Sequence, residues 1–167
     1  MEAKEIHQKL KDKFQDAILD FNEEVLQPYI VVAADKVDEI AEFLRDDDDL
    51  QFDFLNSLSS LDLGENLGVV YHMYSMSKNH KIVIKVEVPK DKPDVKTVSH
   101  IWRTADWHER EAYDLMGINF VNHPDLRRIL LPDDWEGHPL RKDYVPQKSW
   151  HGIPTTLKGE TEDDQEQ

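Results

Sequence analysis

The chain has 167 residues, enough for one domain with a core that buries roughly 70% of the unfolded surface. Its formal net charge is -15, from 35 Asp and Glu against 20 Lys and Arg, and it contains no cysteine. The charge argues against binding to nucleic acid or anionic lipid except through a local basic patch. The lack of cysteine excludes disulfides and thiolate ligands for an iron–sulfur cluster. No apolar run reaches the length of about 18 residues that a bilayer-spanning helix needs. The charged N-terminal segment lacks the apolar core of a secretion signal, so we expect a protein on the cytoplasmic side.

The first elements expected are a helix over residues 3–22, a buried strand over 28–34 and a second helix over 36–45. Apolar residues recur every three or four positions in both helices, which indicates a core-facing stripe. In the first helix these residues are Ile6, Leu10, Phe14, Ile18 and Phe21. Asp35 is expected to cap the second helix. The acidic run 46–49 lacks the ligand spacing of a calcium loop, so a solvated turn is favoured over a metal site.

Three strands follow, over residues 50–58, 67–76 and 80–88. The last alternates most clearly, because its even-numbered residues from Ile82 to Val88 are apolar while Lys85 and Glu87 are charged. Short polar loops separate the three segments, which predicts antiparallel hairpins.

After a turn at 89–94, two helices are predicted, over 94–103 and 106–116. The second begins at Asp106 with Glu109 three residues later, the spacing of a capping box. Gly117 follows its last residue, the usual position for a glycine that ends a helix.

These elements predict an α+β fold, a two-layer domain with a mostly antiparallel sheet packed with helices. The domain is expected to cover residues 1–121. Residues 122–150, here called the arm, are expected to be extended. Residues 151–167 form an acidic tail with too little apolar surface to fold, and are expected to be disordered.

The helix at 106–116 concentrates charge in "DWHEREAYDLMG". Glu111 lies four residues from Trp107 and from Leu115, so it is expected on an apolar face, where a carboxylate needs a partner. Arg110 and Asp114 are also four apart and are expected to pair. One interpretation is a structural ion-pair cluster that ties the helix to the following chain; the other is catalysis.

Within this helix, "HEREA" approaches the H-E-x-x-H motif of zinc peptidases, but Ala112 stands where the second histidine should be, so the motif fails. His123 and His138 each precede a proline in a loop, where a histidine is more often a hydrogen-bonded structural group than a metal ligand. The sequence offers no convincing active site. The alternative from another class is a metal-dependent hydrolase. Its candidate residues are His108, Glu109, His123 and Asp133.

The arm contains "NHPDLRRILLPDDWEGHPLRKDYVP", in which four prolines block helix and favour an extended chain. It carries many apolar side chains, and exposed apolar surface of this extent calls for a binding partner. Its basic residues suit pairing with carboxylates, either with Glu109 and Glu111 or across an interface. Part of the arm is expected to lie on its own domain and the rest on another protein, although an ordinary wrap onto its own core is the alternative. The apolar residues are Leu126, Ile129, Leu130, Leu131, Trp135, Leu140 and Tyr144, and the basic ones are Arg127, Arg128, Arg141 and Lys142.

The segments "EREAYDLMGINFVNHPDLRRIL" and "PDDWEGHPLRKDY" resemble the signature of the thirty-kilodalton subunit family of proton-translocating NADH:quinone oxidoreductase, respiratory complex I. The resemblance covers residues 109–144 and mixes charged, aromatic and proline positions. The signature positions are filled without a departure by Glu109, Arg110, Glu111, Asp114, Leu115, Met116, His123, Arg127, Ile129 and Leu130.

The resemblance implies a structural subunit of the hydrophilic arm of an oxidoreductase, with no cofactor of its own. NADH, FMN, iron–sulfur clusters and quinone would be bound by other subunits. The implied partners are the quinone-site (D-type, forty-nine-kilodalton) subunit and neighbouring iron–sulfur subunits. The implied location is the cytoplasmic side of the cell inner membrane, peripheral and through the complex. An alternative is the equivalent subunit of a membrane-bound hydrogenase or another quinone-reducing dehydrogenase.

Twelve residues are expected to serve partner binding and assembly. They are Glu109, Arg110, Glu111, Asp114, His123, Arg127, Arg128, Trp135, His138, Arg141, Lys142 and Tyr144.

Overall fold

The fold is known from a computed structural model, which describes residues 1–155. Its main sheet has five strands in the order β1-β2-β5-β4-β3, and only the β2–β5 pair is parallel. These strands are β1 (Ile18–Asn22), β2 (Tyr29–Val32), β3 (Phe54–Asp62), β4 (Asn66–Ser75) and β5 (His80–Pro89). The helices are α1 (Ala3–Phe14), α2 (Val37–Asp46) and α3 (Thr104–Met116). The predicted α+β class with a mostly antiparallel sheet is confirmed.

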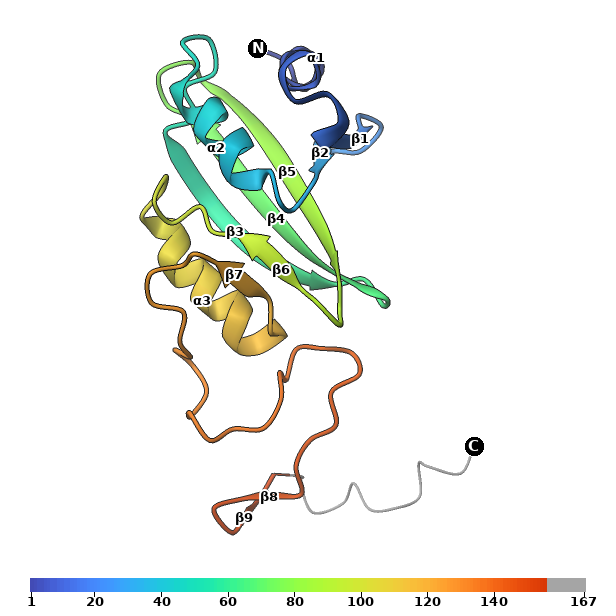
Figure 1. Cartoon of the computed structure of the whole chain (residues 1–167), viewed down its shortest axis with the longest axis vertical. Coiled ribbons are helices and arrows are strands. Elements are labelled where there is room, and N and C mark those ends of the chain that lie inside the picture. Colours follow the sequence, from blue (N-terminus) through green and yellow to red (C-terminus); the bar gives the residue numbers. More distant parts are fainter. Residues whose placement is uncertain (156–167) are drawn as a thin grey trace.

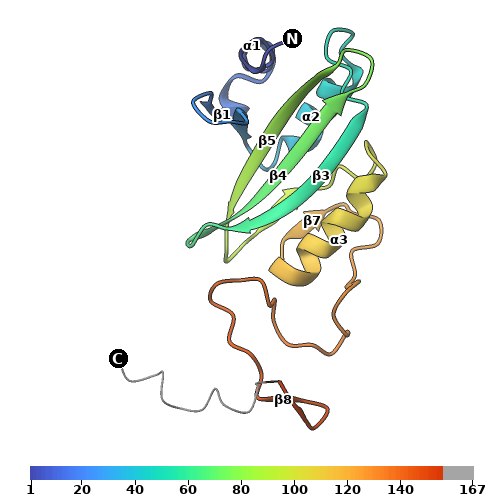
Figure 2. The ribbon, with the colours of Figure 1, turned by 180° about the vertical axis from the view of Figure 1, so that it is seen from behind.

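The helices occupy different places around the sheet. In Figure 1, α2 and a short ribbon of β6 (Asp94–Lys96) and β7 (Asn119–Val121) lie in front of the sheet, and α1 lies at its upper end. The two strands of the ribbon are parallel. Figure 2, from behind, shows β3, β4 and β5 without a helix over them. Helix α3 lies along β3 in both views, so it stands at the edge of the sheet.

The apolar core lies between the sheet and the elements in front of it. Strand β5 alternates as predicted, because Ile82, Ile84, Val86 and Val88 are buried and point toward this core. The largest fully buried side chains include Tyr71, Phe52 and Phe120, from three different parts of the chain. Burial of a large side chain of this kind contributes roughly 1.5–3 kcal/mol relative to leaving it exposed.

The predicted helix over residues 3–22 is wrong in its second half. Helix α1 ends at Phe14, Gln15 adopts a left-handed φ of 41°, and a 3₁₀ turn (Gln15–Ala17) leads into β1. Strand β1 then pairs with β2, and this pairing provides hydrogen-bond partners for the backbone groups of β1. Ile18 is buried although it lies in a strand, so the apolar stripe indicated burial correctly but not the secondary structure.

The predicted helix over 94–103 is also wrong. Residues 94–96 form β6, and the following turns place Val98 and Trp102 in the core without a helix. The Thr97 N–H donates to the carbonyl of Val121, so partners distant in sequence override the local helical pattern. The first of the three predicted strands likewise begins at Phe54 rather than at residue 50, because a turn at residues 48–50 follows α2 and residues 51–53 are irregular.

Helix α2 forms as expected, but its N-cap is Lys36 without a side-chain bond, and not Asp35. The acidic run 46–49 covers the last residue of α2 and the turn after it, where Asp47 and Asp49 both pair with Lys9.

Residues 122–148 contain no helix or strand, and the arm passes below α3 as a wide loop in Figure 1. A short hairpin follows, made of β8 (Ser149–Trp150) and β9 (Ile153–Pro154). The acidic tail predicted over 151–167 therefore begins within this hairpin, and its residues 156–167 lie outside the described residues. Within residues 1–155, no helix has the length and apolar character required to span a bilayer.

Candidate functional site

Asp114 anchors the near part of the arm to α3. Its Oδ2 accepts hydrogen bonds from three successive backbone N–H groups of the arm at 2.8–3.0 Å, and its Oδ1 accepts one from Arg128 at 3.1 Å. The three N–H donors belong to Ile129, Leu130 and Leu131. Burial favours the protonated carboxyl, but these donors and Arg128 together hold the pKa of Asp114 below its ordinary value. The fully buried carboxylate therefore orders a turn of the arm through charge-assisted bonds.

The C-terminal carbonyls of α3 are bound by a later part of the arm. Such carbonyls have no partner within the helix. His138 Nδ1–H donates to the carbonyl of Asp114 at 2.9 Å, and the Leu140 N–H donates to that of Leu115 at 3.1 Å. The Arg141 guanidinium donates to the carbonyls of Met116 at 2.7 Å and Gly117 at 3.4 Å. A cation at this end also interacts favourably with the helix dipole.

Gly117 ends α3 in the left-handed conformation, as predicted, with φ of 69°. A Cβ at this position would lie within 2.5–2.6 Å of His138 and Arg141. The glycine therefore serves two purposes, since it ends the helix and lets the arm approach closely.

Glu109, a residue of α3, is buried and faces the turn after β6. It accepts hydrogen bonds from Thr97 Oγ1 at 2.5 Å and from the Val98 N–H at 2.8 Å. Burial raises the pKa of Glu109 to about 7, with the Asp106 charge adding to the rise and the two donors opposing it. The predicted capping box is therefore wrong: the N-cap is Arg103, and Glu109 bonds to the core side of the helix.

Two other expectations about α3 are wrong. Glu111 is exposed and so is Trp107, so the face on which they lie is not the buried one. Arg110 does not pair with Asp114, which pairs with Arg128 instead. Arg110 is buried; it donates to the carbonyl of Arg127 at 3.4 Å and lies over the Trp107 ring at 5.0 Å.

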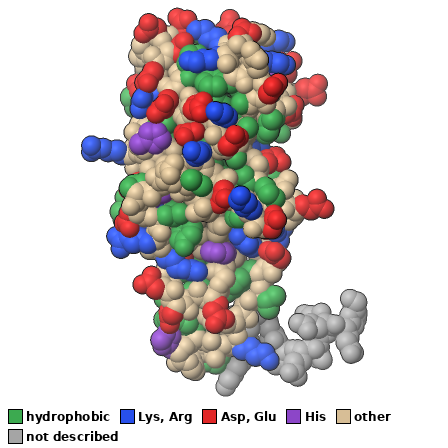
Figure 3. Space-filling view, viewed as in Figure 1, with side chains coloured by type: hydrophobic (Ala, Val, Ile, Leu, Met, Phe, Trp, Pro, Cys, Tyr) green, Lys and Arg blue, Asp and Glu red, His purple; other side chains and the backbone are tan. Residues whose placement is uncertain are grey.

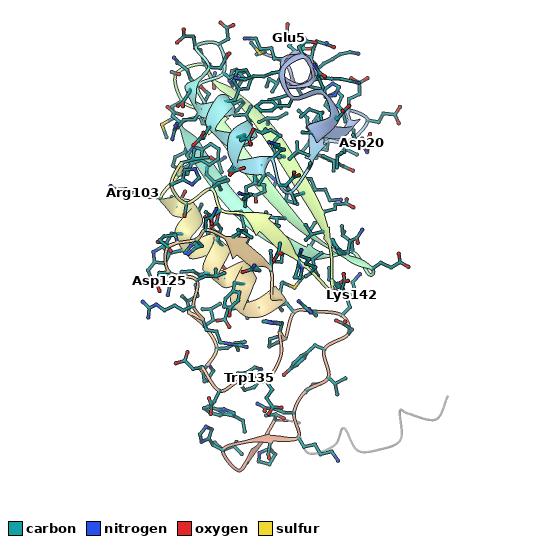
Figure 4. All side chains as sticks on the ribbon, viewed as in Figure 1. Glu5, Asp20, Arg103, Asp125, Trp135 and Lys142 are labelled. Carbon is teal, nitrogen blue, oxygen red and sulfur yellow. The ribbon has the colours of Figure 1, made fainter. Side chains whose placement is uncertain are left out.

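The far part of the arm has its own aromatic contacts. Trp135 Nε1–H donates to the hydroxyl of Tyr144 at 3.2 Å, and the Trp135 and Trp150 rings lie 6.1 Å apart. Tyr144 also lies against Gly137, where a Cβ would be 2.9 Å from its ring. Figure 4 places Trp135 well below α3, so this cluster stabilises the loop itself and not its contact with the domain.

The remaining basic residues of the arm do not pair with Glu109 or Glu111. Arg127 is exposed and pairs with Asp125 at 2.9 Å. Lys142 lies where the arm returns to the foot of the sheet (Figure 4), and its backbone N–H, not its exposed side chain, donates to Asp62 at 2.8 Å. Bonds from this N–H, Lys90 and Gly64 hold the pKa of Asp62 well below its usual range.

Several large apolar side chains of the arm and of the hairpin after it point to solvent. Leu130 is 61% exposed, Leu140 59%, Val145 83% and Ile153 62%. Acidic side chains are spread over the domain in Figure 3, whereas residues 122–150 contain five basic and five acidic residues. The arm is thus fixed on one side and presents an apolar, electrically balanced surface on the other.

Among residues 1–155, no group of three or more His, Asp or Glu side chains could hold a metal ion. His123 lies near Glu109, but Asp133 is on the exposed outer part of the arm, so the residues of the hydrolase alternative do not form one ligand set.

Sequence reasoning missed Thr97, Asp62 and Tyr71. Thr97 donates a hydrogen bond to Glu109, and Asp62 accepts one from the arm backbone at Lys142. The buried Tyr71 hydroxyl lies near Glu109. Thr97 and Tyr71 lie in segments that look like ordinary core, so no local signal marks them. Asp62 ends a strand before a turn, where a carboxylate is common.

The family model for the 30 Kd subunit of respiratory-chain NADH dehydrogenase matches residues 30–149. The C-type subunit of the NADH-quinone oxidoreductase of Chloroherpeton thalassium is 49% identical over 147 residues, covering 86% of this chain and 61% of that protein. This chain thus spans about three fifths of that relative. The same subunit of Chlorobium phaeobacteroides is 43% identical, covering 86% of this chain and 89% of that protein.

Two solved structures are similar to this chain. A trypsin-resistant fragment of Nqo5 has a TM-score of 0.60 at 26% identity, covering 72% of this chain and 98% of the fragment. A chain of the archaeal membrane-bound sulfane sulfur reductase has a TM-score of 0.69 at 21% identity, covering 85% of each chain, and shows a shared fold. The chain belongs to the family of the 30-kilodalton subunit of respiratory-chain NADH dehydrogenase.

Proposed function

We propose that this chain is a structural subunit of the hydrophilic arm of a proton-translocating NADH:quinone oxidoreductase and binds no cofactor itself. NADH, FMN, iron–sulfur clusters and quinone would be held by its partners. The family membership and the names of the relatives support this role.

One observation carries the proposed contact with a partner. The backbone of residues 122–150, the arm of this chain, is fixed to α3 by Asp114 and the helix C-terminus. Leu130, Leu140 and Val145 nevertheless remain exposed. Ordering a segment costs about 1–2 kcal/mol per residue, and binding an ordered surface avoids most of that cost. The arm is therefore preorganised for a partner with a complementary apolar surface.

The partner we propose is the quinone-site (D-type) subunit, together with neighbouring iron–sulfur subunits. The chain would then lie on the cytoplasmic side of the inner membrane as a peripheral member of the complex. Its acidic surface disfavours direct contact with anionic lipid, so attachment would come through the other subunits.

The test is affinity purification of the tagged full chain from detergent-solubilised membranes, followed by mass spectrometry. Co-isolation of the quinone-site and iron–sulfur subunits of an NADH dehydrogenase is the expected result. Isolation of the chain without a companion would overturn the proposal, and isolation with hydrogenase subunits would favour the equivalent subunit of that complex.

A scaffold role also predicts that Arg141→Ala lowers the amount of assembled complex but leaves the turnover of the assembled complex unchanged. A fully assembled complex with altered turnover would contradict it.

A further inference from the structure

A groove lies beside the start of α1, at the end of the molecule away from the arm (Figure 1). It has a volume of about 690 Å³, and α1, the loop from β1 to β2 and strands β3 to β5 surround it. Much of its lining is apolar, with Phe21, Pro28 and Val83 half-buried and Met73 and Ile82 buried. Ligand pockets commonly have volumes of about 300–1,000 Å³, so the groove has room for a large side chain of a binding partner.

The loop from β1 to β2 adds exposed apolar side chains beside the groove. Leu26 is 100% exposed and Val25 is 41% exposed. They directly precede Gln27 and Pro28, which line the groove. A single exposed leucine is ordinary, but exposed apolar side chains next to an apolar groove form a contiguous patch of the kind that marks an interaction site.

The groove continues onto the face of β4 and β5 that no helix of residues 1–155 covers (Figure 2). Val83 on β5 lines the groove and lies opposite His72 on β4 and Tyr29 on β2. Lys85, the next residue of β5 on this face, pairs with Glu87 at 2.7 Å, so its charge is balanced. The middle of the face therefore carries little net charge, although 33% of the residues of the chain are charged. The centres of protein interfaces are likewise depleted in charged residues and enriched in aromatic ones.

The rim of the groove is acidic on the side of β1. Residues 15–28 contain four acidic residues and no lysine or arginine. Lys4, at the start of α1, is paired with Glu23 at 3.5 Å, and Lys81 belongs to β5, on another side of the groove. Glu24 forms no ion pair with the described residues.

The charge of the chain narrows the choice of occupant. A second copy of this chain, with its own net charge of -15, would be repelled, and so would nucleic acid or an anionic membrane. The surface is instead complementary to a different protein that presents an apolar side chain with lysine or arginine beside it.

We propose that the groove and the loop beside it form a second protein-docking site, which binds a segment of another subunit that has an apolar anchor side chain flanked by lysine or arginine. The site is separate from the arm, because Glu5 of α1 and Trp135 of the arm lie at opposite ends of the molecule (Figure 4). The chain then binds two neighbours at once and fixes the distance between them. This inference rests on the proposed function, since it requires the chain to be part of a complex.

The test places the photo-reactive residue p-benzoylphenylalanine at Gln27 of the tagged full chain, irradiates intact membranes and identifies the crosslinked peptides by mass spectrometry. Gln27 lines the groove and is exposed, so the change leaves the core intact. The expected result is a crosslink to a segment of another subunit in which an apolar residue lies next to lysine or arginine. A crosslink to a second copy of this chain, or to lipid alone, would overturn the proposal.

The same probe at Leu130 separates failure of the docking site from failure of the proposed function. A crosslink from Leu130 without one from Gln27 would overturn the docking site and leave the scaffold role in place. No crosslink from either position would contradict the scaffold role and the docking site together.

A charge reversal tests the acidic rim. Glu24→Lys should lower the yield of the Gln27 crosslink about threefold, because it places a positive charge opposite the basic residues of the partner. Asp48→Lys makes the same change in net charge in the turn after α2, outside the lining of the groove, and should leave the yield unchanged. Equal yields in the two variants would contradict the basic flanks assigned to the partner.

Discussion

Residues 1–121 and the arm are stabilised in different ways. The first are held by a continuous apolar core, from Ile6 in α1 to Phe120 in β7. The arm is held mainly by hydrogen bonds to α3, at one carboxylate and four carbonyl groups. Apolar burial is non-directional, whereas hydrogen bonds fix position and leave the apolar side chains of the arm available. The comparison indicates that the core provides stability and that the arm provides a positioned surface.

The largest effect is expected from the core. Phe52→Ala should lower the free energy of unfolding by about 3–5 kcal/mol, because it removes a fully buried ring. Urea titration monitored by circular dichroism measures it. Phe54→Ala is the matched control, since this ring two residues away is 40% exposed and should cost much less. Similar losses in both variants would show that burial in the core is not what distinguishes them.

A pH-dependent effect of about 3 kcal/mol is expected from Glu109. Its pKa is about 7 in the folded chain against an ordinary value of 4.5, so the folded state favours the proton. This contribution is fully present below pH 4.5 and is lost as the pH rises to 7. Unfolding free energies between pH 4.5 and 8 should show this decline in the wild type and in Glu111→Gln, and lose most of it in Glu109→Gln.

Asp114→Asn should loosen the arm while leaving the core in place. An amide oxygen is a weaker acceptor than a carboxylate and does not pair with Arg128, so we expect a loss of about 2 kcal/mol in arm docking. The amides of Ile129, Leu130 and Leu131 should exchange about 30-fold faster, since 1.4 kcal/mol corresponds to a factor of ten. Buried amides of β4 and β5 should keep their rates. Faster exchange throughout the sheet would show that the arm and the core unfold together.

A smaller effect, about 1 kcal/mol, is expected where the arm approaches Gly117. Gly117→Ala places a methyl group against His138 and Arg141, whereas Gly64→Ala, also at positive φ, meets nothing within 4 Å. The difference between the two variants in unfolding free energy isolates the contact with the arm. Equal losses would mean that the backbone conformation alone accounts for both.

The sequence predicted the elements whose pattern is local. The alternation of β5, the hairpins and the end of α3 at Gly117 all depend on neighbouring residues. It failed where a distant partner decides the structure, as for β1, which pairs with β2, and β6, which pairs with the later β7.

The same distinction holds for the site. The sequence identified Asp114, Arg128, His138 and Arg141 as residues of interest, but spacing along α3 placed Glu111, and not Glu109, on a buried face. The orientation of α3 is set by its packing against β3 and the turn after β6, which periodicity within the helix does not contain. The residues of a partner that would contact the arm are not encoded in this chain, so its sequence cannot predict them.

The most direct test of the scaffold role compares two leucines with the same exposure. Leu130 lies on the arm and Leu19 on the edge strand β1, and both are 61% exposed. Neither Leu130→Ser nor Leu19→Ser should change the unfolding free energy of the purified chain by more than about 0.5 kcal/mol. Quantified by native gel electrophoresis of solubilised membranes, the assembled complex should fall several-fold in Leu130→Ser and stay at the wild-type amount in Leu19→Ser. Full assembly with Leu130→Ser would contradict the role assigned to the arm.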